Sequence, residues 1–94
     1  MVTIEFSKQS LNDLEAIFDF ISKDSLKYAK YQIDVLINQT ELISEFPLIG
    51  HKIPEKNDES IREIVKGNFR IIYKIHHSKI SILTFHHVKK QLNI

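Results

Sequence analysis

Apolar and polar residues alternate at the start of the chain, and the spacing then changes to that of a helix. Residues 2–6 (VTIEF) alternate strictly, which predicts a short strand with one buried face. Either Ser7 or Ser10 can cap a helix that follows, because a hydroxyl oxygen accepts from the free N–H groups of the first turn. The next apolar residues recur every three or four positions and predict this amphipathic helix; they are Leu11, Leu14, Ile17, Phe18 and Ile21.

A second helical pattern follows a polar break at residues 22–25 (SKDS), which contains a new helix cap. Pro47 ends this helix near Phe46, since proline cannot continue a helix and restricts the residue before it. Two helices joined by so short a break are expected to form an antiparallel hairpin. The inward positions of the second helix are Ala29, Ile33, Leu36, Ile37, Thr40 and Ile43.

The second half of the chain predicts a loop followed by three strands. The loop comprises residues 46–50 (FPLIG) and the polar stretch 55–60. The predicted order of elements is β-α-α-β-β-β. We expect a single α+β domain over residues 1–94, with the helical hairpin packed on one face of a small, largely antiparallel sheet. The three strands span residues 61–66, 69–75 and 80–88, with Gly67-Asn68 and His77-Ser78 as turns.

The last turn also predicts which residues of the final two strands face each other. A two-residue turn at His77-Ser78, followed by an unbroken register, sets Arg70 opposite Phe85. His87 is then the diagonal neighbour of Arg70, and all three side chains share the face turned away from the helices. This expectation depends on the register, because a slip of one residue exchanges the two faces.

The predicted strands carry two further residues of interest, Tyr73 and Arg62. Tyr73 pairs with Ile82 and belongs to the core, with its hydroxyl reaching the sheet edge. The position of Arg62 depends on the turn that follows its strand. A two-residue turn at Gly67-Asn68 places Arg62 on the helix side, whereas a longer loop with a bulge places it beside Arg70.

The formal net charge of +1 is an average over two unlike halves. Residues 1–50 carry four basic and eight acidic side chains, a net charge of −4, whereas residues 51–94 carry nine basic and four acidic ones, a net charge of +5. The helical half is therefore acidic and the strand half is basic. An anionic partner, either RNA phosphate or an acidic protein segment, is expected to meet the sheet, unless the basic face is simply solvated.

Several chemistries have no support in the sequence. The chain has no cysteine, which excludes disulfides, thiolate metal sites and a thiol nucleophile. The pairs His76-His77 and His86-His87 do not predict a metal site, because neighbouring strand residues point to opposite faces. No glycine-rich phosphate loop is present, so we expect neither a metal nor a cofactor. No apolar run is long enough for a membrane span, and we expect a cytoplasmic protein without membrane contact.

Four segments have an order and spacing that point to a known family. They are DLEAIFDFI (residues 13–21), FPLIG (46–50), IREIVKGNFRIIYKI (61–75) and ISILTFHHVKK (80–90). Together they cover nearly the whole chain and resemble the RelE/ParE family of bacterial toxins from type II toxin–antitoxin modules. Phe69 stands where many members of this family have tyrosine.

The resemblance implies a growth-inhibiting toxin, of a class linked to plasmid stabilization. It also implies a cognate antitoxin whose flexible segment wraps the toxin, and hence a toxin–antitoxin hetero-oligomer. RelE-like members enter the ribosomal A site and cleave mRNA. ParE-like members inhibit DNA gyrase and show no nuclease chemistry.

Under the RelE-like alternative, Arg62, Arg70 and His87 match family positions that carry function. Metal-independent RNA cleavage needs a base, an acid and a cation that stabilises the phosphorane charge. His87 can transfer protons near neutral pH, and the two arginines can hold the phosphate. Both arginines also have a structural interpretation, because a strand arginine often stacks on an aromatic ring or pairs with a carboxylate.

The C-terminal residues favour the ParE-like alternative. RelE-like members often carry tyrosine or another aromatic residue just before the C-terminus, whereas residues 88–94 (VKKQLNI) contain none. We therefore expect gyrase inhibition in preference to ribosome-dependent mRNA cleavage. A third interpretation is an inactive toxin homologue that acts only as a binding module.

Overall fold

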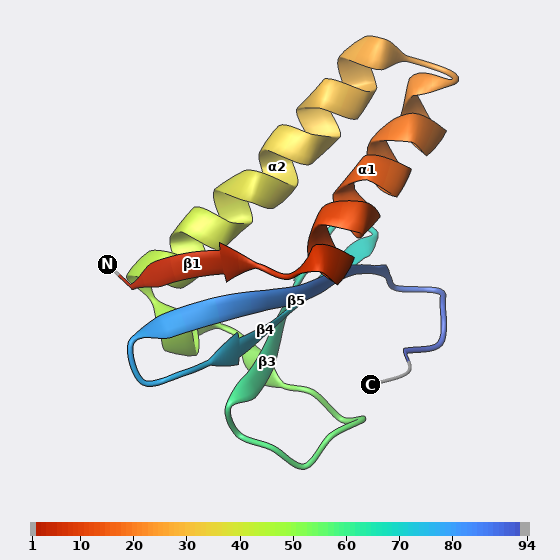
Figure 1. The fold of residues 1–94 in the computed structure, drawn as a ribbon. Coiled ribbons are helices and arrows are strands. Elements are labelled where there is room, and N and C mark those ends of the chain that lie inside the picture. The colour runs from red at the N-terminus through yellow and green to blue at the C-terminus, as the bar shows by residue number, and fades with distance from the viewer. Residues whose placement is uncertain (1, 93–94) are drawn as a thin grey trace.

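The computed structural model describes residues 2–92. Residues 93 and 94 of the tail considered above lie outside this range. The two predicted helices and four predicted strands are present, with one short 3₁₀ helix and one short strand added between α2 and β3 (Figure 1). The elements are β1 (Thr3–Phe6), α1 (Lys8–Ser22), α2 (Leu26–Glu45), η1 (Pro47–Ile49), β2 (His51–Lys52), β3 (Ile61–Lys66), β4 (Phe69–Ile75) and β5 (Lys79–His87).

Serine hydroxyls begin both helices. The Ser7 side chain accepts from the Ser10 N–H at the start of α1, and the Ser25 side chain accepts from the Tyr28 N–H at the start of α2. Helix α2 ends at the residue before Phe46, as the following proline requires. The two helices form an antiparallel hairpin that lies on one face of the sheet (Figure 1).

The five strands form one sheet in the order β1-β5-β4-β3-β2. Strand β1 pairs in parallel with β5, and the other neighbours are antiparallel. The α+β class and the packing of a helical hairpin on a largely antiparallel sheet are therefore confirmed. Lys66 pairs with Phe69 across a two-residue turn in which Gly67 has a φ of 60°. This turn sets Arg62 opposite Tyr73, on the side of the helices, which is the first of the two positions considered above.

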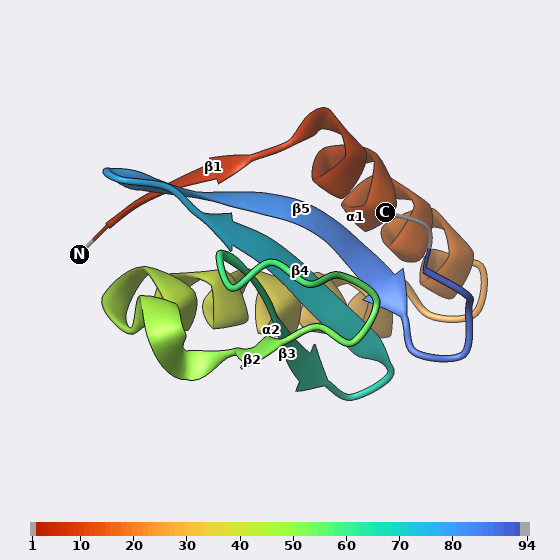
Figure 2. The same ribbon diagram turned by 90° about the horizontal axis from the view of Figure 1, so that it is seen from below.

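Apolar clusters cover both faces of the sheet, although the sequence predicted only one. The larger cluster, on the helix side, contains Leu36, Ile43, Ile71, Tyr73, Ile80, Ile82 and Phe85. The smaller cluster, on the other side, contains Ile53, Ile61, Ile72 and Leu92. Figure 2 shows the segment between β2 and β3 crossing this second face. Ile53 anchors the segment, because its side chain is almost fully buried.

The register between β4 and β5 differs from the expected one beyond Tyr73. Tyr73 pairs with Ile82 as predicted, but Ile72 pairs with Thr84, so Leu83 is an extra residue in β5. From this bulge onward every residue of β5 is displaced by one position. The expectation that Phe85 lies opposite Arg70, on the outer face, is therefore wrong.

The corrected register separates Arg70 from His87. Arg70 pairs with His86, whereas His87 pairs with Phe69. Phe85 turns to the helix side, where its ring stacks on Phe6 with centroids 6.5 Å apart. The prediction that Arg70 and His87 share one face is thus wrong, because a single inserted residue exchanges the faces.

Residues from the start of α1 hold the bulge in place. The Ser7 N–H donates to the Ile82 carbonyl at 3.0 Å, and the Ser7 hydroxyl donates to the Leu83 carbonyl at 2.9 Å. Asp13 accepts through Oδ2 from the Phe85 N–H at 3.1 Å and from the Thr84 hydroxyl. These contacts join residues more than seventy positions apart, so no local pattern in the sequence announces the bulge.

Candidate functional site

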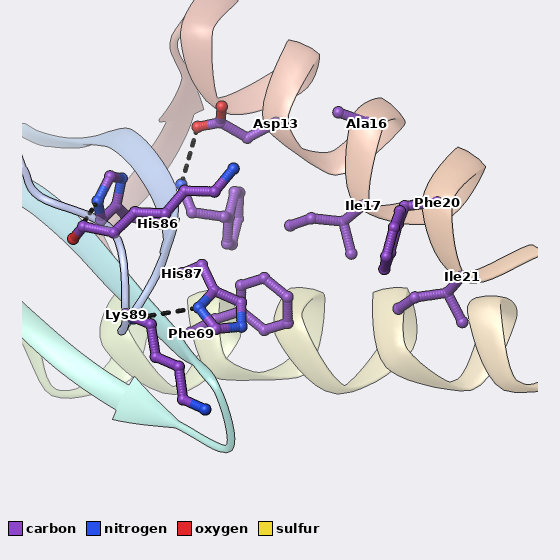
Figure 3. Close-up of a pocket in the computed structure, with 11 residues that line it drawn as sticks. Asp13, Ala16, Ile17, Phe20, Ile21, Phe69, His86, His87 and Lys89 are labelled. Atoms are coloured by element: carbon purple, nitrogen blue, oxygen red, sulfur yellow. Dashed lines mark hydrogen bonds between the residues drawn. The ribbon is translucent and has the colours of Figure 1, made fainter.

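A groove of about 590 Å³ lies between α1 and the C-terminal end of β5 (Figure 3). Helix α1 supplies Ile17 and Phe20 to its lining, and the sheet supplies Phe69 and Phe85. Phe20 is 72% exposed, so most of this ring is available to a partner. Together these residues make an apolar surface that is open to solvent.

Basic and imidazole side chains complete the lining of the groove. Lys89 and Lys90 follow the end of β5, and both line the groove together with His86 and His87. The two lysines belong to the basic half of the sequence. An apolar surface with adjacent cations suits a protein segment that carries both apolar and acidic side chains.

The two adjacent histidines point in different directions (Figure 3). His87 packs edge-on against Phe69, with ring centroids 5.5 Å apart, and its Nδ1 accepts from the Lys89 N–H at 3.1 Å. His86 Nε2 lies 3.0 Å from the Lys90 carbonyl oxygen, to which it can donate. Both rings therefore hold the turn after β5. Among residues 2–92, no three His, Asp or Glu side chains are grouped as ligands for a metal.

Arg70 is held by two carboxylates on the opposite face of the sheet. Its Nη1 and Nη2 donate to both carboxylate oxygens of Glu55, at 2.7 and 2.9 Å. Its Nε and Nη2 donate to Glu63, at 2.8 and 3.0 Å. The Arg70 side chain is only 12% exposed. The hydrogen bonds to Glu55 and then to Glu63 raise the pKa of Arg70, so the guanidinium stays charged within this clamp.

We expect the Glu55–Arg70 pair to make the free energy of unfolding fall as the pH falls through the acidic range. The hydrogen bond from Arg70 lowers the pKa of Glu55 from 4.5 to about 2. A lowered folded-state pKa adds stability above pH 4.5, and this stability is lost as the pH falls toward 2. Glu55→Gln removes the ion pair and should therefore lower the free energy of unfolding at pH 7. We expect a loss of only about 0.5–1 kcal/mol, because the Glu55 side chain is one-third exposed and water weakens the pair.

Urea unfolding of both proteins at pH 7 and at pH 2.5 measures this difference. The gap between them should narrow at the lower pH, where Glu55 begins to bind a proton. Glu59→Gln, at an exposed carboxylate of the same loop, is the matched control and should show no such gap. An equal difference in the free energy of unfolding at both pH values would show that the Glu55–Arg70 pair does not cause the pH dependence.

Arg62 and Tyr73 hold the loop before β2. Arg62 Nη1 donates to the Gly50 carbonyl at 2.9 Å, while its buried Nε has no hydrogen-bond partner among the described residues. The fully buried Tyr73 donates its hydroxyl to the Pro47 carbonyl at 2.7 Å and accepts from the Gly50 N–H at 2.9 Å. Burial raises the pKa of Tyr73. The prediction that Tyr73 lies in the core with its hydroxyl near the sheet edge is confirmed.

The three residues predicted for catalysis do not form one constellation. Arg62 is on the helix side and bonds the loop, Arg70 is clamped on the opposite side, and His87 lies in the groove. Glu55 was not predicted as a partner of Arg70, because it lies fifteen residues earlier in a polar loop that carries no periodic signal. The contact of Asp13 with β5 was not predicted either, because the helical pattern around Asp13 gives no sign of a strand partner.

No curated protein is similar in sequence to this chain, but solved structures share its fold. One belongs to the chromosomal ParDE toxin–antitoxin system of P. aeruginosa, with a TM-score of 0.77 and 17% identity over 95% of this chain and 98% of that one. The RelBE2 complex of Mycobacterium tuberculosis has a TM-score of 0.59 and 19% identity, over 92% of this chain and 96% of that one. The DinJ–YafQ complex of E. coli has a TM-score of 0.53 and 20% identity, over 93% of each chain.

Within residues 2–92, neither helix combines the length and the apolar composition needed to cross a membrane.

The sequence itself shows the family. The model for the ParE toxin of the type II toxin–antitoxin system parDE matches residues 4–92, nearly the whole chain. This match includes both helices, β2 to β5, all of β1 except Thr3, and the groove beside His87. The chain therefore belongs to the ParE toxin family of type II toxin–antitoxin systems.

Proposed function

We propose that this ParE-family toxin stops growth by binding DNA gyrase in the cytoplasm, without RNA cleavage, and that a cognate antitoxin neutralises it. The observation that carries the proposal is the separation of Arg70 from His87. They lie on opposite faces of the sheet, and two carboxylates already occupy the Arg70 guanidinium.

Metal-independent RNA cleavage needs a proton-transfer group and a cation at the same phosphate. A phosphate beside His87 in the groove has Lys89 and Lys90 nearby, but not the Arg70 guanidinium on the other face. A phosphate at Arg70 must displace Glu55, which binds this arginine through two hydrogen bonds. The Arg70–His87 pair that the resemblance implies for cleavage is therefore not assembled, which supports action by protein contact.

The groove between α1 and β5 suits the proposed antitoxin. Its exposed Phe20 and the lining residues Ile17 and Phe85 offer apolar contacts, and Lys89 and Lys90 offer charge to an acidic segment. The similar ParDE, RelBE2 and DinJ–YafQ structures are of toxin–antitoxin systems or complexes, which supports a hetero-oligomer here. We propose that an amphipathic, acidic segment of the antitoxin occupies this groove.

Two parallel measurements after induction of the toxin test the proposal: plasmid supercoiling by gyrase, and the 5′ ends of cellular mRNA. We expect supercoiling to fail while mRNA stays intact. Codon-phased mRNA cuts with normal supercoiling would contradict the proposal and support a ribosome-dependent endonuclease. Normal growth at confirmed expression would support an inactive binding module. Coexpression of a small acidic protein from the neighbouring reading frame should restore growth.

The variant His87→Ala separates the two mechanisms at one residue. We expect it to keep at least half of the growth inhibition, because the proposed mechanism uses no proton transfer. Loss of a nuclease acid or base typically lowers the rate by about 100-fold or more, which would abolish toxicity. Circular dichroism must first show that the variant is folded, since His87 packs on Phe69. Toxicity lost in a folded His87→Ala protein would contradict the gyrase mechanism.

A further inference from the structure

We propose that the outer edge of β1 is a second binding site, which accepts an extended, basic segment of another protein as a sixth strand. The site consists of this edge and of the groove between β1 and α2. It lies apart from the groove at the end of β5, and it does not depend on the target of the toxin.

Strand β1 is the last strand on its side of the sheet, so only one of its edges is paired. The Ser7 N–H points to β5, where it donates to the Ile82 carbonyl. Main-chain groups of successive strand residues point to alternate edges, so Thr3 and Glu5 also face β5. Ile4 and Phe6 then direct their N–H and C=O groups outward.

The contacts of Val2 support this assignment. The Val2 N–H donates to the Ser44 carbonyl at 3.1 Å, and the Ser44 hydroxyl donates to the Val2 carbonyl. Val2 is an outward residue by the same alternation, and the last turn of α2 thus covers the first position of the edge. Within residues 2–92, no hydrogen bond from another element continues this row to Ile4 and Phe6. An open row of this kind is a template for another strand.

A groove of about 320 Å³ runs beside the open edge. Ile4 and Phe6 line it from β1, and Ile37 and Thr40 line it from α2. In strand addition, main-chain hydrogen bonds supply affinity and pockets for alternate side chains supply specificity. An added strand would lie about 4.8 Å from β1. Its alternate side chains would then enter this groove, where small or β-branched apolar groups fit.

The charge around the edge selects a basic occupant. Glu41 lines the groove, Glu45 ends α2, and the exposed Glu5 lies on β1 itself. Only Glu5 has a described cation beside it, since Lys79 Nζ lies 3.2 Å from its carboxylate. A second copy of this chain would bring the same acidic groups toward one another. An extended segment that alternates apolar and polar residues and carries lysines avoids this repulsion.

The probe for this site is an acetylated and amidated peptide of sequence KVTVTVK, added to the isotope-labelled toxin. NMR titration should shift the amide signals of Ile4 and Phe6, and hydrogen exchange should show that both amides become protected. N-methylation of the peptide at alternate residues that face β1 should weaken binding about tenfold or more, because two or three main-chain hydrogen bonds are lost. N-methylation at the other alternate residues is the matched control.

A charge reversal tests the acidic rim. Glu41→Lys should weaken peptide binding by about two- to fivefold, as expected for an exposed ion pair. Glu15→Lys, on the exposed surface of α1, should leave binding unchanged. The proposal fails if Ile4 and Phe6 stay unperturbed, or if both sets of N-methylated peptides bind equally. A dimer of the toxin alone that protects these two amides would also overturn it, because the edge would then belong to a second copy.

Discussion

Replacing Gly50 with alanine should lower the free energy of unfolding by about 3 kcal/mol, because the added Cβ has no room. It would lie 2.6 Å from the Glu63 carbonyl oxygen and 2.6 Å from the Tyr73 hydroxyl. Neither atom can move freely, since one is sheet backbone and the other belongs to a fully buried ring. In a domain of this size such a loss lowers Tm by about 12–24 °C, which thermal unfolding measures directly.

Gly67 provides the matched control for this substitution. A Cβ at Gly67 meets no atom within 4 Å, but its φ of 60° is strained for other residues. Gly67→Ala should therefore cost only about 1 kcal/mol. Tyr73→Phe removes one of the two groups that crowd position 50, so its cost and that of Gly50→Ala should not add in the double variant. Equal losses for both glycine variants would show that crowding at Gly50 is not the cause.

Replacing Asp13 with alanine should cost about 2 kcal/mol and loosen the end of β5. The change leaves the Phe85 N–H and the Thr84 hydroxyl without their acceptor, and both residues are buried. An unsatisfied buried donor carries the full cost of its lost hydration. Hydrogen exchange by NMR should show the Phe85 amide losing protection by about 30-fold, which corresponds to 2 kcal/mol.

Two variants separate the carboxylate of Asp13 from its place on the helix. Asp13→Asn keeps one oxygen acceptor, so it should lose about half as much stability. Asp19→Ala removes an exposed carboxylate from the same helix and should change stability by less than about 0.5 kcal/mol. If Asp13→Ala leaves the exchange of Phe85 unchanged, the bulge is held by Ser7 and the strand ladder alone.

Much of the fold follows from short-range patterns in the sequence. Ser7 and Ser25 cap the helices, and the proline at position 47 ends α2, because each acts within one helical turn. The two-residue turn at Gly67-Asn68 likewise follows from local backbone geometry, and it decides the face of Arg62. The apolar alternation of β4 predicts the helix-packed face up to Tyr73, where the expected pairing with Ile82 is observed.

The candidate site was predictable only in its parts. Arg62, Arg70 and His87 stand out in the sequence as residue types suited to RNA chemistry, and all three lie on the expected strands. Their relation to one another depends on Leu83, the extra residue of β5, because it turns His87 to the other face. The availability of Arg70 depends on Glu55, which approaches it from a loop without a repeating pattern.

The sequence by itself therefore determined the kind and order of the elements, since hydrophobic period, caps and turns act over a few residues. Only the tertiary structure decided the bulge in β5, the second apolar cluster and the clamp on Arg70. Ser7 and Asp13 meet β5 from the opposite end of the chain, and Glu55 reaches Arg70 of β4 from the loop between β2 and β3. Such contacts form only after the strands are paired, so the face that carries His87 and the carboxylates around Arg70 are properties of the assembled sheet.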